Sequence, residues 1–303
     1  MIRFVEHKDI DKQWWDATLM QASNKLPYAN SWMLDSVSPN WNALIDEERG
    51  MIMPLPWRKK YGIKYVFTPF PLQQLGLFGP KEIDHKLMDE FLEAIPKTYK
   101  KVDLQLNWKC RTERTDLFIE EWINMLVDLD RPVDEIKSGF SKNHIRNIKK
   151  HNSSGAEIRR LEDPTIVIKA FRKWKLPDLK GQKLEMKNVE RLIDACEQNS
   201  AGIAYASYLN DELVCAAYFI LNMDRIIYLK GASSADGKKI GAMHAIMDHV
   251  VEQHANDHKV LDLGGSNNPA LARFYKGFGA EVSIYLHVVK EAFPGLKKRI
   301  KFR

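Results

Sequence analysis

The segment at residues 261–280 constrains the fold more than any other part of the sequence, because it combines a strand, a turn and a helix in one short stretch. Residues 261–263 alternate apolar and polar side chains as a strand does, and the glycines at 264–265 allow a tight turn. Pro269 predicts the start of a helix that carries Tyr275 two turns further on. Ligands of open α/β sheets bind where such strands end, so Tyr275 is a candidate for giving or taking a proton. A structural Tyr275, with its hydroxyl bonded to a carbonyl under the sheet, is the alternative.

The sequence upstream of this segment predicts three antiparallel strands and a crossover helix. Residues 203–209, 213–221 and 226–230 are apolar, aromatic-rich runs separated by short polar turns. From residue 240 to 251 the apolar positions follow a helical period, and the chain then returns to the strand that ends before Gly264. A strand, helix and strand of this length imply a parallel pair with a right-handed crossover. With a last strand after the Tyr275 helix, the second half therefore has the order β-β-β-α-β-α-β.

The turn at residues 231–242 joins the third strand to the crossover helix and contains three glycines, two serines and two lysines. Free backbone amides and the positive end of a helix dipole favour an anion such as a phosphate. An ordinary polar loop with a serine helix cap is the alternative. The candidates for binding a phosphate-bearing donor are Ser233, Ser234, Gly237, Lys238, Lys239, Gly241 and Ala242.

Three segments together carry a family resemblance: residues 141–155, residues 231–242 and residues 264–280. In these segments the chain resembles the GNAT acyltransferase superfamily, and within it the FemAB-like branch of peptidoglycan-bridge proteins. The resemblance is clearest over residues 140–285 and implies an α/β (α+β) fold with mixed sheets. It also implies an acyl coenzyme A as co-substrate.

The family pattern can be compared with this chain position by position. In GNAT enzymes, loop amides in a pattern of Gln or Arg, two residues, Gly, one residue, then Gly or Ala hold the pyrophosphate of the donor. Lys238, Gly241 and Met243 occupy those places here, and Met243 departs from the pattern. The family's general acid matches Tyr275, where FemAB-like cross-bridge enzymes tend to carry a lysine. Tyr275 therefore favours acyl coenzyme A as the donor, whereas Met243 argues against it.

We expect an N-acyltransferase in which an amine attacks the donor directly, because no cysteine or serine has the surroundings of a catalytic triad. Asp262 is the candidate for accepting the proton of the amine, and Ser266 and Asn267 are placed to contact a substrate. Two alternatives remain open. One is an aminoacyl-tRNA-dependent transferase that modifies cell-wall precursors, and the other is a non-catalytic binding protein on a degenerate GNAT scaffold.

The first half of the chain predicts the same order of elements as the second. Residues 41–55 form a predicted hairpin, residues 64–67 a strand, residues 87–95 a helix and residues 102–106 another strand. The chain is therefore expected to hold two GNAT-like halves in tandem, at residues 1–137 and 138–303. The second half carries the donor loop and the catalytic edge.

The first half lacks a loop rich in glycine and lysine before its helix, so we expect it to form a wall of the acceptor cleft. Gln73 and Gln74, in the loop at residues 68–76, are the candidates for contacting the acceptor. Rigid packing of this loop, with both amides bonded to the backbone, is the alternative.

Composition and charge limit the class of protein and its partners. The 303 residues carry a net charge of +6 and only three cysteines, without metal-ligand spacing, so we expect reduced thiols, no metal site and a cytoplasmic location. The N-terminus has no signal-peptide pattern, and no apolar run is long enough to insert in a membrane. Basic residues crowd positions 142–151 and 297–303, which favours an anionic partner, with charged tRNA as one option.

Overall fold

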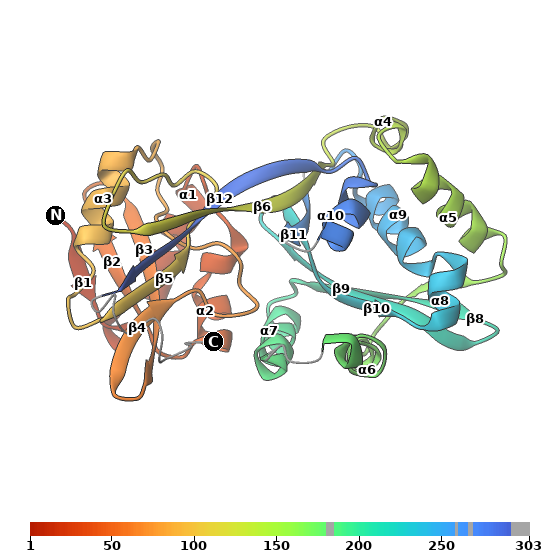
Figure 1. The fold of residues 1–303 in the computed structure, drawn as a ribbon, viewed down its shortest axis with the longest axis horizontal. Helices are drawn as coiled ribbons and strands as arrows, with labels where there is room; N and C mark the ends of the chain where they lie inside the picture. The colour runs from red at the N-terminus through yellow and green to blue at the C-terminus, as the bar shows by residue number, and fades with distance from the viewer. Residues whose placement is uncertain (180–184, 258–259, 266–268, 292–303) are drawn as a thin grey trace. The chain divides into compact units, whose positions relative to one another are not determined.

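The structure is a computed structural model that describes residues 1–179, 185–257, 260–265 and 269–291 (Figure 1). The chain forms two compact units, and each unit takes parts from distant regions of the sequence. The first unit comprises Met1–Trp122, Lys183–Leu192 and Ile284–Arg303, and the second comprises Ile123–Gln182 and Ile193–Ser283.

The first unit is built on strands in the order β1-β2-β3-β4-β5-β12. These strands are β1 (Arg3–Val5), β2 (Trp41–Asp46), β3 (Met51–Lys60), β4 (Ile63–Phe67), β5 (Lys101–Gln105) and β12 (Glu281–Glu291). Its helices are η1 (His7–Asp9), α1 (Lys12–Gln21), η2 (Pro27–Ala29), α2 (Ser31–Val37) and α3 (His85–Glu93). The predicted hairpin, strands and helix of the first half are therefore confirmed, with the helix ending earlier than expected.

Helix α3 covers one face of this sheet. Its N-cap residue is Asp84, whose carboxylate accepts a hydrogen bond from the amide of Leu87. Met88, Phe91 and Leu92 recur at helical spacing and are buried in a core with the inward side chains of β3, β4 and β5. Burial of this apolar face stabilises the helix on the sheet.

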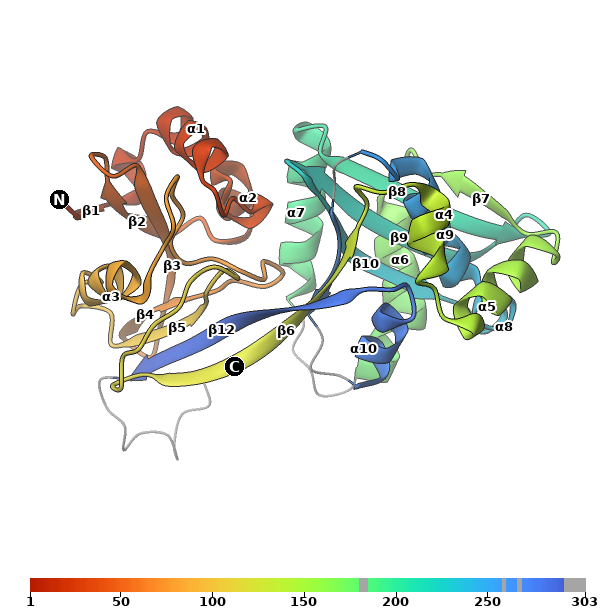
Figure 2. The same ribbon diagram turned by 90° about the horizontal axis from the view of Figure 1, so that it is seen from above.

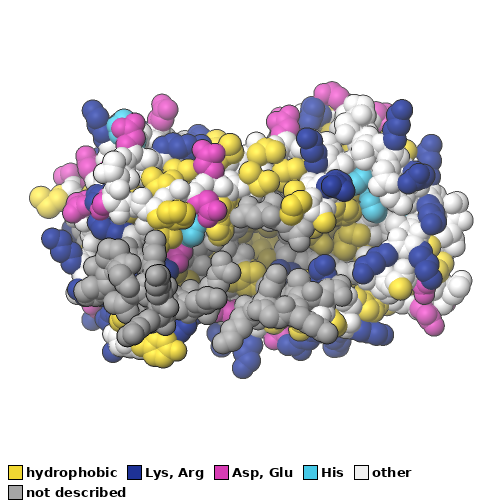
Figure 3. All heavy atoms as spheres, viewed as in Figure 1, with side chains coloured by type: hydrophobic (Ala, Val, Ile, Leu, Met, Phe, Trp, Pro, Cys, Tyr) yellow, Lys and Arg dark blue, Asp and Glu magenta, His cyan; other side chains and the backbone are white. Residues whose placement is uncertain are grey.

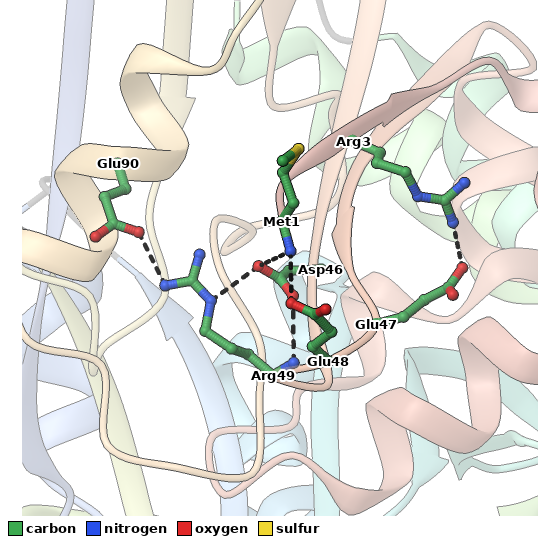
Figure 4. Close-up of polar contacts among 7 residues, drawn as sticks. All are labelled: Met1, Arg3, Asp46, Glu47, Glu48, Arg49 and Glu90. Atoms are coloured by element: carbon green, nitrogen blue, oxygen red, sulfur yellow. Dashed lines mark hydrogen bonds and ion pairs between the residues drawn. The ribbon is translucent and has the colours of Figure 1, made fainter.

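A polar network at the edge of the first unit ties the β2–β3 turn to the chain terminus and to α3 (Figure 4). The buried carboxylate of Asp46 lies 2.9 Å from Nε of Arg49 and 3.2 Å from the ammonium of Met1. Burial alone raises the pKa of Asp46, but the hydrogen bonds from Arg49 and the N-terminus outweigh it and lower that pKa. Nη1 of Arg49 also lies 2.8 Å from Glu90 of α3, so this network has a structural role.

The second unit contains strands in the order β7-β8-β9-β10-β11-β6. These strands are β6 (Phe118–Asp128), β7 (Glu157–Arg160), β8 (Gly202–Leu209), β9 (Glu212–Asn222), β10 (Arg225–Ser233) and β11 (Val260–Gly265). Its helices are α4 (Val133–Ser138), α5 (Lys142–Asn152), α6 (Thr165–Trp174), η3 (Leu176–Leu179), α8 (Ala235–Ile240), α9 (Ala242–His254) and α10 (Pro269–Lys276). Helix α7 (Met186–Gln198) begins in the first unit and ends in the second.

The core of the second unit lies between its sheet and α9. Ile246 and Val250 of α9 are buried with Phe219 of β9 and Leu261 of β11. The predicted three-stranded meander is confirmed as β8, β9 and β10, and the predicted crossover connects β10 to β11 as a parallel pair. The crossover differs from the expectation in one respect, because it contains the short helix α8 before the long helix α9.

The two units repeat one strand pattern. In each, three antiparallel pairs lead to one parallel pair, β4–β5 or β10–β11, and an antiparallel strand closes the series. The mixed α/β fold with two GNAT-like halves is therefore as expected.

The closing strands are exchanged between the halves of the sequence. Strand β6 begins in the first unit and ends in the second, whereas β12 runs from the second to the first; Figure 2 shows both as long strands. The compact units therefore interleave along the chain, whereas the expected halves at 1–137 and 138–303 were contiguous. Among the residues that the structure describes, no helix is both long and apolar enough to cross a bilayer.

Candidate functional site

The parallel pair of the second unit opens before its strands end. Pairing between β10 and β11 stops at Ile227 and Asp262, although β10 continues to Ser233 and β11 to Gly265. A β-bulge between Tyr228 and Lys230 comes directly after the last pair. Beyond Ile227, the backbone groups of β10 that point toward β11 therefore have no partner on that strand.

Tyr275 lies beside this opening. Its side chain is 4% exposed, and its ring centroid is 6.3 Å from that of Tyr228 in an edge-to-face arrangement. The hydroxyl of Tyr228 is itself 3.8 Å from the sulfur of Met243 on α9. Burial, and then the charge of Asp262, raise the pKa of Tyr275 above its ordinary value, so the phenol keeps its proton throughout the neutral range.

Asp262 is fully buried on β11 and is held by two partners. One carboxylate oxygen lies 2.8 Å from Nη1 of Arg225, and the other accepts a hydrogen bond of 2.9 Å from the amide of Gly264. Its role as a base stays a prediction, but the geometry supports a carboxylate that fixes the backbone at the end of β11. Ser266 and Asn267, which follow β11 in the sequence, lie outside the described residues.

Lys230 is a residue of the opening that sequence reasoning missed. It follows the bulge of β10, and its ammonium lies 5.4 Å from the ring centroid of Phe171 on α6. Burial lowers the pKa of Lys230 to about 8, so a substantial fraction of the amine is neutral in mildly alkaline solution. The signal was present in the sequence, because Lys230 ends the predicted apolar run at residues 226–230, but its half-buried position depends on the packing of α6.

The predicted phosphate loop is folded more tightly than an open loop. Ser234 caps α8 by accepting a hydrogen bond of 3.0 Å from the amide of Gly237, and the hydroxyl of Ser233 lies 3.1 Å from the sulfur of Cys215. Gly237 packs on the backbone of Val214, since an added Cβ would lie 2.1 Å from that carbonyl oxygen. The two serines and Gly237 therefore already hold α8 on β9 and β10.

Gly241 joins α8 to α9 in a left-handed conformation, with φ of +79°. A Cβ at this position would lie 2.6 Å from the carbonyl oxygen of Asn147, so α5 crosses close to the start of α9. Ala242 is fully buried, whereas Lys238 and Lys239 are exposed. Of the predicted donor-binding side chains, these two lysines have the most freedom to meet a ligand, although Lys239 also pairs with Asp236 of its own helix.

An aromatic cluster fastens α5 to α9 and α10. Nε2 of His144 lies 2.8 Å from the carbonyl oxygen of Phe274 and therefore donates to it, which leaves Nδ1 to accept from the hydroxyl of Ser141 at 2.9 Å. The ring of His244 packs on that of His144 at 4.6 Å. Burial, and then the neighbouring His144, lower the pKa of His244 to about 4. Both rings are therefore neutral at physiological pH and serve the packing of the three helices.

The outer face of α5 is strongly basic. Lys142, Arg146, Lys149 and Lys150 are all exposed on this helix, and Lys and Arg side chains gather over α5 and α8 on the face shown in Figure 3. The lysines and the arginine of the basic segment predicted at residues 142–151 therefore lie on a solvated helix face, whereas its two histidines, His144 and His151, are buried.

The two glutamines predicted to meet the acceptor lie in the first unit and have partners there. Oε1 of the buried Gln74 accepts a hydrogen bond of 2.9 Å from the amide of Trp108, and Oε1 of Gln73 lies 3.4 Å from the hydroxyl of Tyr28. These contacts favour the packing role that was the alternative for this loop. Acceptor binding by the two side chains stays a prediction.

Comparisons with known proteins agree with this geometry. Residues 140–277 match the family described as acetyltransferase (GNAT) domain. No curated protein sequence matches the chain.

Solved structures of low sequence identity share the fold over nearly the whole chain. FemX has a TM-score of 0.68 at 13% identity, covering 96% of this chain and 98% of its own. The C-terminal domain of a protein described as a lysylphosphatidylglycerol synthetase from Agrobacterium fabrum has a TM-score of 0.59 at 12% identity, covering 92% and 91%. A tandem GNAT protein from the clavulanic acid biosynthesis pathway has a TM-score of 0.52 at 9% identity, covering 97% and 100%. The chain therefore carries a GNAT acetyltransferase domain at residues 140–277, within a FemX-like fold of two GNAT-like halves.

Proposed function

We propose that the second unit transfers an acyl group from acyl coenzyme A to an amine, by direct attack in the opening between β10 and β11. The observation that carries this proposal is the early end of pairing at Ile227 and Asp262. Unpaired strand edges bind extended chains through backbone hydrogen bonds, and the pantetheine arm of coenzyme A is an extended chain with amide groups. The opening therefore suits a donor of this kind.

Tyr275 stabilises the leaving group in this proposal. The nitrogen of the amine attacks the carbonyl carbon, the C–S bond breaks, and the electron pair stays on sulfur. A thiol has a pKa of about 8.5, below the raised pKa of Tyr275, so the phenol keeps its proton and donates a hydrogen bond to the thiolate. In this role Tyr275 donates a hydrogen bond to the charge that develops on sulfur, but it does not give up its proton as a general acid would.

Lys230 accepts the proton of the attacking amine. Its lowered pKa of about 8 gives the neutral amine form that a base requires, and its backbone position borders the opening. We expect kcat/KM to rise with pH through about 8, and Lys230→Gln to lose that rise. Lys59→Gln is the matched control, because Lys59 is an exposed residue of β3 in the first unit. An unchanged pH profile in Lys230→Gln would remove Lys230 from the mechanism.

Donor binding is tested separately from chemistry. Acetyl coenzyme A at about 100 times its dissociation constant should stabilise the protein by about 2.7 kcal/mol, which a thermal shift detects. Neutralising Lys238 and Lys239 together should weaken this binding, whereas neutralising Lys59 and Lys60 of the first unit should not. Thiol release with a panel of amines then measures transfer. No shift and no thiol release with any acyl coenzyme A would contradict the proposal.

A second candidate is an aminoacyl-tRNA donor, with a cell-wall or lipid precursor as the amine. The basic face of α5 and the FemX-like fold favour it. Binding to phosphate backbones falls with salt by a power of about 0.7 to 0.9 for each phosphate neutralised. We expect weak RNA binding that vanishes near physiological salt; tight binding that is lost in Arg146→Ala would favour the tRNA donor. A protein that binds neither donor would be a non-catalytic member of the fold.

A further inference from the structure

The hairpin that joins β3 to β4 carries like charges near its turn. Lys59 of β3 lies directly opposite Lys64 of β4 in the strand register, and both side chains are exposed. The ammonium of Lys64 lies 4.7 Å from the ring centroid of Trp57, but neither lysine has an ion pair with a carboxylate among the described residues. Like charges at opposite positions destabilise a strand pair. The two ammonium groups therefore repel each other in the free protein.

Two further lysines lie beside the hairpin, in the chain that connects α3 to β5. The amide of Lys100 donates to the carbonyl of Lys64 at 2.9 Å, and Lys97 comes shortly before it in the sequence. Both side chains are exposed, and Nζ of Lys100 donates to the carbonyl of Lys97 at 3.0 Å. An ammonium has several donors, so Lys100 keeps donors for an anion. The hairpin surface consists of these residues and the hairpin's own: Lys59, Tyr61, Lys64, Lys97 and Lys100.

Carboxylates close to the hairpin surface in the sequence have other partners. Asp103 of β5 lies 2.8 Å from Nζ of Lys101, and Glu93 of α3 lies 2.6 Å from Nη1 of Arg114. The lysines of the hairpin surface are therefore not neutralised by these acids. The hairpin also extends beyond the neighbouring strand β5 (Figure 1). A protruding set of positive charges attracts an anionic partner.

Tyr61 occupies the turn of this hairpin and is 77% exposed. Tyr61 and Gly62 have φ of +50° and +80°, so they form a two-residue turn of the kind that favours Asn or Gly at its first position. A left-handed backbone is unfavourable for a large side chain, and an exposed ring adds little to the core. Neither the turn nor packing therefore accounts for a tyrosine here. A membrane–water interface attracts such an amphipathic ring.

We propose that the hairpin surface docks the protein on an anionic lipid bilayer. The lysines meet the anionic lipid headgroups, and the ring of Tyr61 enters the interface at their level. A protruding end with one aromatic side chain suits a flat bilayer, whereas single-stranded nucleic acids bind in basic grooves with a series of stacking aromatic side chains. The docking involves neither the opening between β10 and β11 nor the lysines of α8, so it does not depend on the acyl-transfer proposal.

The test measures binding of the full chain to lipid vesicles by cosedimentation. Vesicles of phosphatidylcholine with about one third phosphatidylserine are the anionic probe, and vesicles of phosphatidylcholine alone are the neutral match. We expect saturable binding to the anionic vesicles, and binding to the neutral vesicles that is weaker by about tenfold or more. Binding to the anionic vesicles should also weaken as added salt screens the charges.

A double variant tests the lysines. Lys59→Gln combined with Lys64→Gln should weaken binding to the anionic vesicles by about twentyfold, because each lysine at an anionic leaflet contributes about fivefold. The control is Lys149→Gln combined with Lys150→Gln, which removes the same charge from the exposed basic face of α5 in the second unit. This control should leave vesicle binding nearly unchanged.

A single variant tests the aromatic ring. Tyr61→Asn places at the turn a residue that tolerates the left-handed backbone, so folding is preserved. It should weaken vesicle binding by about tenfold, because an aromatic side chain is no longer buried at the interface. The salt dependence should stay the same, because no charge is lost.

The proposal is overturned if neutral vesicles bind as well as anionic ones, if the two double variants weaken binding equally, or if Tyr61→Asn binds like the unaltered protein. Polyuridylate tests nucleic acid as the partner instead. If the variant of Lys59 and Lys64 weakens polyuridylate binding as much as vesicle binding, the hairpin surface recognises polyanions in general, and docking on a bilayer is rejected.

Discussion

Both units contain one parallel strand pair between antiparallel neighbours, but only the pair in the second unit separates before its strands end. In the first unit, β4 and β5 pair from Tyr65 and Lys101 to Phe67 and Asp103. The chain after β4 then stays against β5, because the amide of Thr68 donates to the carbonyl of Asp103 at 3.1 Å. The first parallel pair is therefore closed along its length.

The second parallel pair differs beyond its last paired residues. A bulge in the pairing of β10 with β9 lies between Tyr228 and Lys230, directly after the last pair of β10 with β11 at Ile227, and no loop among the described residues returns to β11 as the first unit's loop returns to β5. In the first unit, the amide of Leu75 donates to the carbonyl of Gln105 and completes the closure. The comparison shows that one strand pattern supports both a closed scaffold and an open site, and that the continuation of the strands decides between them.

The largest expected effect is on turnover, which should depend on a tyrosine of the second unit but not on one of the first. Tyr275→Phe removes the donor to the leaving thiolate and should lower turnover by about 10² to 10³ fold. Tyr99→Phe in the first unit removes the acceptor of a hydrogen bond from Asn42 and should cost about 1 kcal/mol of stability with turnover unchanged. Steady-state thiol release measures turnover, and urea unfolding measures stability. Equal turnover in both variants would remove the functional difference between the units.

The next effect compares a buried ion pair with an exposed one. Asp262→Asn leaves Arg225 without its charged partner inside the second unit, so we expect a loss of about 3 to 5 kcal/mol of unfolding free energy. Glu90→Gln breaks the exposed pair with Arg49 in the first unit and should cost no more than about 1 kcal/mol. Denaturant titrations of the two variants test this ranking, which would fail if the losses were equal.

Two glycines with the same backbone conformation allow a smaller comparison. Gly62 of the first unit has φ of +80° and open space around its Cα, so Gly62→Ala should cost about 1 to 2 kcal/mol for left-handed strain alone. Gly241 has φ of +79°, but a Cβ there meets Asn147 of α5, so Gly241→Ala should cost about 1 to 3 kcal/mol more. Thermal unfolding of the two variants gives the difference. A Gly241→Ala protein as stable as Gly62→Ala would show that α5 moves aside easily.

The smallest effect is a pH dependence confined to the second unit. His244 has a folded pKa of about 4 and an unfolded value of about 6.5, so its contribution to stability is complete above pH 6.5 and is lost as the pH falls toward 4. His244→Gln should reduce the acid-induced loss of stability by about 1 to 2 kcal/mol, less than the full shift because the ring is partly exposed. His85→Gln, on the surface of the first unit, is the control. Thermal unfolding between pH 4.5 and 7 is the measurement, and identical profiles for His244→Gln and the unaltered protein would contradict the assignment.

Much of the fold could be predicted because the relevant patterns are local. The apolar runs that became β8, β9 and β10 lie within a few residues of each other, and the helical period of α9 is visible in its own sequence. Tyr275 could be placed near a strand end for the same reason. The helix α8 was missed because the glycines around it resemble an open loop, while the cap by Ser234 and the packing of Gly237 on Val214 appear only in the folded chain.

The sequence by itself determined the order of the main strands and helices in each half, the duplicated strand pattern and the place of Tyr275 near a strand end, because each depends on hydrophobic periodicity and turn chemistry over short distances. Only the tertiary structure decided which strands pair to the end and which separate, that β6 and β12 close the units, and that the half-buried Lys230 lies near α6. It also brought Arg58 of β3 to Glu185 beside α7, which are far apart in the chain. These features depend on contacts between distant segments, and such contacts leave no pattern in the neighbouring residues.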